Sequence, residues 1–333
     1  MKRTVLLAAT ALGLAAIALY YSIPALFKEP LLALNRSLSG MEEKAIDAAM
    51  HTIHYLDSGA PAASAETGSD STPVVLLHGI FAEKDHWVDF ARPLTDTYRV
   101  IAPDLPGFGE STRHDNQPYD YAAQVTRLGA FLDAVGIQRA HLAGNSMGGT
   151  IAALYAIEHP ERVASVAFIG APHGIRSPQL SAMDRLIDAG QRPLVAHDAK
   201  AFDAMMALVF EKRPFLPYPI LAATEQEALR NAASNDRLWD AQLKDRYLLD
   251  QQLTKLQQPP TLALWGASDR VFDVSGAQTL QSRMPQAQVD VLPGIGHLPM
   301  MEAPGDTAQR YVEFLSALKA GTKTTHPEKN KQK

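Results

Sequence analysis

Ser146 is the residue whose setting most strongly indicates covalent chemistry. It lies in residues 144–149, G-N-S-M-G-G, after an apolar run and before a helical pattern that begins at Ile151. A G-x-S-x-G sequence between a strand and a helix forms a sharp turn that lifts the serine hydroxyl clear of the backbone. Glycines on both sides remove the Cβ atoms that would collide in such a turn. The motif predicts a nucleophilic serine, which needs a general base because a neutral hydroxyl reacts poorly.

A histidine and an aspartate with suitable chemistry follow two later predicted strands. His297 comes after the strand at 288–292, and Asp269 comes after the strand at 261–264. Histidine titrates near neutrality and can take the serine proton, while a carboxylate on its other ring nitrogen fixes the tautomer. Two alternatives stay open: Asp273 is close enough in the chain to supply the acid, and His297 could instead cap the next helix. The order serine, aspartate, histidine along the chain favours a catalytic triad.

Two other titratable residues follow earlier strands, and local roles explain them better. His78 follows the strand at 74–77 and could be mistaken for the base, but His297 is better placed, so we expect His78 to order its loop. Asp104 could be mistaken for the acid. It lies in Pro103–Ser111, where two prolines and two glycines predict a rigid turn. A short carboxylate in such a turn usually accepts hydrogen bonds from nearby backbone N–H groups.

The elements that must position these residues alternate between strands and helices. Apolar patterns predict strands at 52–56, 74–77, 98–102, 162–169, 261–264 and 288–292, besides the strand that ends at the serine motif. Helices are predicted between strands, from 84 to about 94, over 119–135 and after the serine motif as far as 159. This alternation predicts a mostly parallel sheet covered by helices on both faces, with a site at the carboxyl ends of the strands.

The alternation stops between about residues 171 and 258, where helical patterns are interrupted by prolines. An inserted helical lid over the strand ends is the expected structure. Most of its Met, Phe and Leu side chains would form the core of the lid itself, but Met and Phe also suit a long, flexible apolar ligand. We expect contacts with such a ligand from Phe81, Met205, Phe210 and Leu298.

The first thirty residues predict a membrane segment. Lys2 and Arg3 precede an uncharged run from Thr4 to Phe27, whose length is close to the roughly 20 residues that a helix needs to cross a bilayer. The alternative is a secreted protein whose signal peptide is cleaved near Ala16-Ile17-Ala18. The sequence stays apolar beyond that site, so we favour an uncleaved single-pass anchor. Positive charge at the N-terminus predicts that the catalytic domain lies on the non-cytoplasmic side.

Composition excludes several classes of protein. The formal net charge is -5 and no basic stripe is present, which argues against nucleic-acid binding. The chain has no cysteine, so disulfides, zinc–thiolate sites and a cysteine nucleophile are excluded. Residues 59–73 are small and polar and predict a flexible surface loop. The basic, polar residues after Leu318 predict a disordered tail.

These motifs resemble those of the α/β hydrolases over about residues 40–318. More narrowly, the chain resembles family V bacterial lipases and animal membrane-anchored monoacylglycerol lipases. The matching stretches are His78–Phe81 with Lys84–Trp87, Pro103–Ser111, Gly144–Gly149 and Gly296–Glu302. The resemblance implies hydrolysis of a carboxylic ester of glycerol or a related lipid, through an acyl-enzyme on Ser146 and without cofactor or metal. It also implies that the backbone N–H groups of Ile80 and Met147 form the oxyanion hole.

The expected organisation therefore has four parts: an N-terminal membrane anchor (1–28), an α/β-hydrolase core (40–170 and 259–320), a helical lid (171–258) and a tail (321–333). Two other functions stay open. The serine motif is shared with C–C hydrolases that act on products of aromatic ring fission, for which a polar lid and no anchor would be expected. The second is that of a binding module that has a hydrolase fold but no catalytic activity. Such modules usually lack a triad residue.

Overall fold

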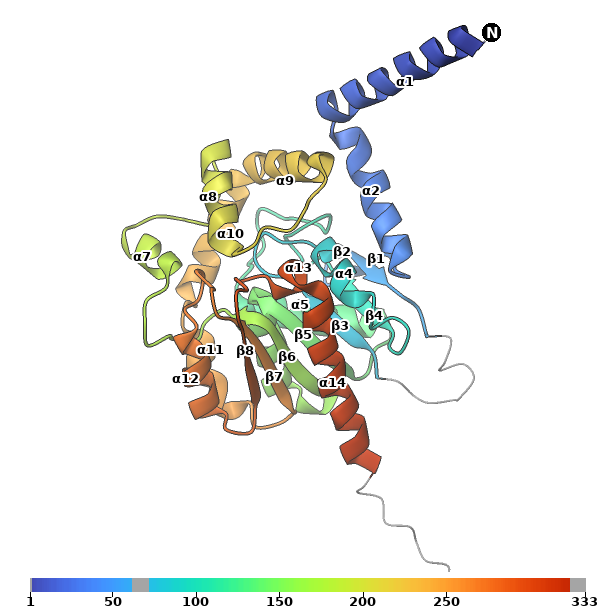
Figure 1. The fold of residues 1–333 in the computed structure, drawn as a ribbon. Coiled ribbons are helices and arrows are strands. Elements are labelled where there is room, and N and C mark those ends of the chain that lie inside the picture. Colours follow the sequence, from blue (N-terminus) through green and yellow to red (C-terminus); the bar gives the residue numbers. More distant parts are fainter. Residues whose placement is uncertain (1, 62–71, 324–333) are drawn as a thin grey trace, which may run out of the picture.

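An eight-stranded sheet runs through the molecule in the order β1-β2-β4-β3-β5-β6-β7-β8 (Figure 1). The computed structural model describes residues 2–61 and 72–323, so most of the loop expected at 59–73 and most of the tail expected at 321–333 lie outside the described residues. The strands are β1 (Glu42–Ala48), β2 (His51–Asp57), β3 (Val74–Leu77), β4 (Val100–Pro103), β5 (Ala140–Ser146), β6 (Val163–Pro172), β7 (Thr261–Gly266) and β8 (Gln288–Leu292).

The sheet is mostly parallel, as predicted for the core. β2 pairs antiparallel with both β1 and β4, and every other neighbouring pair is parallel. The central strands are buried on both faces: in β3, Val75 and Leu77 pack into one core, while Val74 and Leu76 pack into the other. β1 was not predicted, because its sequence, EEKAIDA, is largely charged and has no buried residue.

Helices cover both faces of the sheet. The core with Val75 and Leu77 also includes residues of α5 (Tyr121–Ala134), α6 (Met147–Glu158) and α12 (Ser275–Arg283). The opposite core includes residues of α4 (Val88–Ala91), α13 (Pro299–Glu302) and α14 (Pro304–Lys323). The helix expected from 84 to about 94 is shorter than predicted, with a 3-10 turn η1 (Lys84–Trp87) before α4; a second short turn, η2 (Pro160–Arg162), precedes β6.

Residues 171–258 form a set of helices between β6 and β7, which we call the inserted helices. They are α7 (Ala182–Asp188), α8 (Ala199–Val209), α9 (Tyr218–Arg230), α10 (Ala232–Lys244) and α11 (Leu248–Gln252), followed by the 3-10 turn η3 (Leu253–Lys255). Side-chain caps start two of them: Ser181 forms a capping box with Asp184, and Asp198 accepts from the N–H of Ala201. In Figure 1, α7 to α10 lie above one end of the sheet.

Two helices form the N-terminal arm, where one continuous segment up to residue 28 was expected. α1 (Lys2–Ser22) projects away from the domain, and α2 (Ala25–Leu38) runs back along it (Figure 1). Pro24 starts α2, and a proline both lacks an N–H and disfavours helical backbone in the residue before it. Within the described residues, no single helix is long and apolar enough to cross a membrane. Leu12–Ser22 and Ala25–Leu38 satisfy length and composition only as a pair, bent by 95° at their break.

Candidate active site

Ser146 occupies a strained turn between β5 and α6. Its backbone has φ 52° and ψ −117°, a conformation that residues with a side chain rarely adopt. The turn is possible only with glycine on both sides of it. A Cβ on Gly144 would lie 2.3 Å from the carbonyl carbon of Gly148, and a Cβ on Gly148 would lie 2.1 Å from the carbonyl oxygen of Leu77. The predicted turn between strand and helix is therefore present at Ser146.

His297 and Asp269 are held together by a buried hydrogen bond. Nδ1 of His297 lies 2.9 Å from Oδ2 of Asp269, and both residues are buried. The other carboxylate oxygen, Oδ1, accepts from the backbone N–H groups of Val271 at 2.8 Å and Phe272 at 2.9 Å. These bonds fix the orientation of the carboxylate, and the carboxylate in turn fixes the histidine ring. Nε2 of His297 is then the nitrogen available for proton transfer.

Asp273, the alternative acid, has a different partner. Its Oδ1 accepts from the backbone N–H of Ser275 at 2.9 Å, at the start of α12. This is the local turn role that short carboxylates commonly have at helix starts. Of the two aspartates left open by the sequence, Asp269 is the one bonded to His297.

Ser146 and His297 line one cavity of about 370 Å³, which we call cavity A. Side chains of α8 and α9 contribute Met205, Val209 and Ile220 to its wall. The four residues expected to contact an apolar ligand all line it: Phe81, Met205, Phe210 and Leu298.

A second cavity, cavity B, has a volume of about 450 Å³ and shares Ile80, Ser146 and Leu194 with the wall of cavity A. It is lined by side chains of α7 and α10 and is more polar, with Gln242, Arg246 and Asp184 among its residues. Both volumes lie within the usual range for small-molecule sites. Ser146 therefore lies in the wall of a mostly apolar cavity and of a more polar one.

The two residues expected to supply oxyanion donors, Ile80 and Met147, both line cavity B with Ser146. Met147 is the first residue of α6, so its N–H lacks a partner within the helix. Ile80 lies in the loop after β3, and this loop passes close to the nucleophile. A Cβ added to Gly79 would lie 3.3 Å from Cβ of Ser146. Both residues thus lie close to the serine.

His78 fixes the loop that carries Ile80. Its ring is fully buried, with Nδ1 2.7 Å from the carbonyl oxygen of Gly79, while Nε2 accepts from the N–H of Leu105 at 2.9 Å. Burial lowers the pKa of His78 to about 4, so the ring is neutral near pH 7. Asp104, next to Leu105, accepts from the backbone N–H groups of Lys84 at 2.6 Å and Glu110 at 3.0 Å. These contacts agree with the local roles expected for both residues.

Asn145 and Glu302 support the site and were not singled out from the sequence. Nδ2 of Asn145 donates to the carbonyl oxygens of Ile169 at 2.9 Å and His297 at 3.0 Å. Its position beside the serine in G-N-S-M-G-G was the one available signal. Glu302 accepts from the N–H groups of Gly296 and Lys212, each at 2.9 Å. It therefore joins the turn that carries His297 to the segment after α8.

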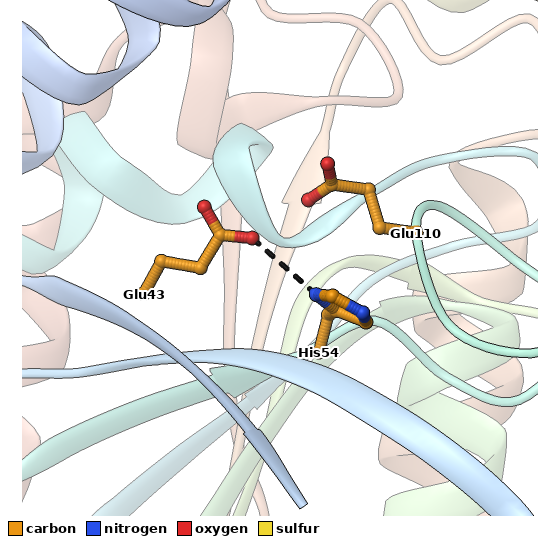
Figure 2. Close-up of side chains that lie close together, drawn as sticks. All are labelled: Glu43, His54 and Glu110. Carbon is orange, nitrogen blue, oxygen red and sulfur yellow. Dashed lines mark ion pairs between the residues drawn. The ribbon is translucent and has the colours of Figure 1, made fainter.

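Within the part of the chain that the structure describes, one group could hold a metal ion by geometry. Ligand atoms of Glu43, His54 and Glu110 lie within 4.8 Å of one another (Figure 2). Nδ1 of His54 is 3.5 Å from Glu43, and Lys84 pairs with both carboxylates, while Arg36 is 2.5 Å from Glu43. Burial raises the pKa of Glu43. At Glu110 burial also acts to raise the pKa, but hydrogen bonds with Glu43 and Lys84 outweigh it and lower the pKa to about 2. Because these cations already balance the carboxylates, we assign no metal here.

Comparisons with known proteins agree with this geometry. A family model described as the alpha/beta hydrolase fold matches residues 72–304. Lipase 1 of Psychrobacter immobilis is 32% identical over 275 residues, covering 80% of this chain and 84% of that protein. The monoacylglycerol lipase abhd6-B of Xenopus laevis is 29% identical over 296 residues, covering 86% of this chain and 85% of that protein. The crystal structure of a membrane phospholipase A superposes with a TM-score of 0.84 at 36% identity, covering 96% of this chain and 99% of that one.

Proposed function

This chain belongs to the α/β-hydrolase family and is a carboxylic ester hydrolase, and we propose that it cleaves lipid esters through an acyl-enzyme on Ser146. As the serine oxygen attacks the ester carbonyl, Nε2 of His297 takes its proton, and Asp269 stabilises the resulting imidazolium. The N–H groups of Ile80 and Met147 bind the oxyanion. Removing one such donor typically raises the activation free energy by about 2.7–4 kcal/mol. The alcohol leaves with the proton from His297. Water then attacks the acyl-enzyme, releases the fatty acid and restores the serine.

The observation that carries this proposal is that Ser146 lines both cavity A and cavity B. A lipid ester has an apolar acyl chain on one side of its carbonyl and a more polar alcohol on the other. With the carbonyl at Ser146, the acyl chain would lie in cavity A against Phe81, Met205, Phe210 and Leu298. The alcohol would lie in cavity B, where polar side chains such as Gln242 could bind hydroxyl groups. The relatives named as lipases and as a phospholipase support a lipid as the substrate.

We infer that the inserted helices, residues 171–258, act as a lid on a core made of residues 40–170 and 259–320. The support is that α8 and α9 line cavity A, while α7 and α10 line cavity B. A substrate in either cavity would be covered by these helices, which would keep water from the acyl-enzyme until the alcohol has left.

We infer further that the N-terminal arm attaches the enzyme to a membrane as a single-pass anchor, with the catalytic domain on the non-cytoplasmic side. The support is apolar α1, the aromatic pair Tyr20 and Tyr21 near its end, and Tyr218 of α9, whose ring lies 5.0 Å from that of Tyr21. Aromatic residues of this kind are enriched at membrane surfaces. Intact mass of the protein recovered from the membrane fraction tests this: loss of the first residues near Ala18 would show a secreted, processed form instead.

Replacing Ser146 tests the function. Ser146→Ala should abolish hydrolysis of p-nitrophenyl and monoacylglycerol esters, and a fluorophosphonate should label the wild type at Ser146. Ser165→Ala is the matched control. Ser165 is also a buried serine, but it lies near the start of its strand, β6, where its hydroxyl contacts Nδ1 of His141. The variant should leave hydrolysis nearly unchanged. The proposal would be overturned if the wild type hydrolysed no ester of any chain length, or if Ser146→Ala kept its hydrolytic activity.

A further inference from the structure

Helix α2 supplies part of the wall of cavity A. Leu31, Leu32 and Asn35 line the cavity that also contains Ser146 and His297. These three residues lie on one face of the helix, since residues separated by three or four positions share a face. Two neighbouring leucines of α2 do not line the cavity: Leu34 and Leu38 are 58% and 67% exposed. The arm therefore has one side turned to the candidate site.

An ion pair fixes α2 to the core beside this wall. Arg36 is 4% exposed, and its guanidinium donates two hydrogen bonds to the carboxylate of Asp85, from Nε to Oδ1 at 2.6 Å and from Nη2 to Oδ2 at 2.7 Å. Such two-point pairs between arginine and a carboxylate fix orientation as well as distance. Asp85 lies a few residues after the loop that carries Ile80 and itself lines cavity A. The pair thus holds α2 against the core beside the cavity.

A second contact joins α2 to the inserted helices. Nζ of Lys28 lies 3.3 Å from Oε2 of Glu227 in α9 and 3.9 Å from Oε2 of Glu83. α2 therefore packs between the core and α9 and lines one side of cavity A.

From these contacts we propose that α2 is a specificity element: its inner face, Leu31 and Leu32, forms the far wall of the acyl-chain subsite and sets the length of chain that is accepted. This inference rests on the proposed ester hydrolysis at Ser146. A short acyl group would fill only the part of cavity A near the serine and would not reach α2. A long acyl group would lie against Leu31 and Leu32, where each additional methylene gains apolar contact. The N-terminal arm would then select substrate in addition to any role as an anchor.

Tryptophan substitutions at positions of α2 that line cavity A and at one that does not test this in the full-length protein. Leu31→Trp and Leu32→Trp place a larger side chain in the wall of cavity A. Leu34→Trp is the matched control, because Leu34 is exposed and does not line the cavity. The readout is the ratio of kcat/KM for p-nitrophenyl laurate over p-nitrophenyl butyrate, which share one leaving group. We expect the ratio to fall about tenfold in the two inner variants, and to change less than about twofold in Leu34→Trp.

Activity on butyrate separates the two proposals. A wild type that hydrolyses neither ester would refute the proposed function. A wild type active on both esters, with an unchanged ratio in Leu31→Trp and Leu32→Trp, would refute only the role of α2. An equal fall in all three variants, or a parallel loss on butyrate and laurate, would also overturn it, because neither pattern follows from a wall that long chains alone can reach.

Discussion

Two regions around Ser146 are held in place by different kinds of contact. One is the rim, the residues Ser146, Asp269 and His297 at the strand ends, which is fixed by backbone groups such as the N–H of Val271. The other is the roof, helices α2, α8 and α9 over cavity A, which is joined by side-chain ion pairs such as Lys28 with Glu227. Backbone contacts persist when side chains change, whereas single side-chain pairs can be lost in one substitution. The difference predicts chemistry that depends on a few rim residues, and selectivity that the roof can alter gradually.

The largest predicted effect concerns the rim. Asp269→Asn should lower kcat about 10⁴-fold, because an amide can no longer hold His297 in the required tautomer. Asp273→Asn is the control; Asp273 contacts the N–H of Ser275 and should change kcat only a few-fold. Steady-state kinetics on p-nitrophenyl butyrate measures both. Equal losses in the two variants would contradict the assignment of the acid and the contrast between rim and roof.

A second prediction concerns the stability of the protein at acid pH and the loop that carries Ile80. The pKa of His78 falls from an ordinary 6.5 to about 4 on burial, so below pH 6.5 the unfolded chain binds a proton that the folded protein resists. The free energy of unfolding should therefore fall as the pH drops from 6.5 to 4, by about 3 kcal/mol from this residue, with no such contribution above pH 6.5. Denaturant titrations at several pH values measure it.

His78→Asn is the control for that titration, because asparagine has no proton to gain in this range. The variant should be less stable than wild type at pH 7, but its stability should decline less steeply toward pH 4. Parallel curves for the two proteins would mean that the ring of His78 titrates freely, and that the loop carrying Ile80 is not built around a neutral histidine.

The sequence predicted the rim better than the roof, and the reason is physical. Strands β3 and β8 have the bounds that their apolar patterns predicted, and parallel strands bring residues that follow them to one edge. Asp269 and His297 could therefore be placed together without knowing the packing of any helix. The bond from Asn145 to the carbonyl oxygen of His297 could not, because the strand pattern does not specify the direction or the partner of the asparagine side chain.

The roof depends on which helix faces meet, and local patterns do not specify that. In α2, Pro30 and charged residues interrupt the apolar run, so nothing in residues 25–38 marked Leu31 and Leu32 as part of a cavity. The residues expected to contact an apolar ligand do lie around cavity A, but their contact with substrate stays a prediction. Glu302 lay in a stretch used for the family resemblance, yet its bond to Lys212 depends on how the inserted helices pack.

Glu302 joins the two regions, and its removal should have an intermediate effect. Glu302→Ala removes the acceptor of the N–H groups of Gly296 and Lys212. This loss should lower the free energy of unfolding by about 1–2 kcal/mol at this half-buried position. Glu302→Gln keeps an oxygen acceptor and should lose less. Denaturant unfolding measures both variants. Unchanged stability in Glu302→Ala would indicate that the backbone bond from the N–H of His297 to the carbonyl oxygen of Val209, at 3.0 Å, is enough to join the rim and the roof.

The smallest predicted effect is at Lys28 and Glu227, within the roof. Their side chains are 22% and 31% exposed, and ion pairs at this exposure typically contribute less than about 1 kcal/mol. A double-mutant cycle with Lys28→Met and Glu227→Gln should therefore give a coupling energy below about 1 kcal/mol, decreasing further at high salt because exposed charges are screened. A coupling of several kcal/mol would contradict the comparison, because the roof would then be held as firmly as the rim. A small coupling, together with an altered ratio of laurate to butyrate hydrolysis in the same variants, would show that weak contacts of α2 adjust selectivity while the triad geometry stays fixed.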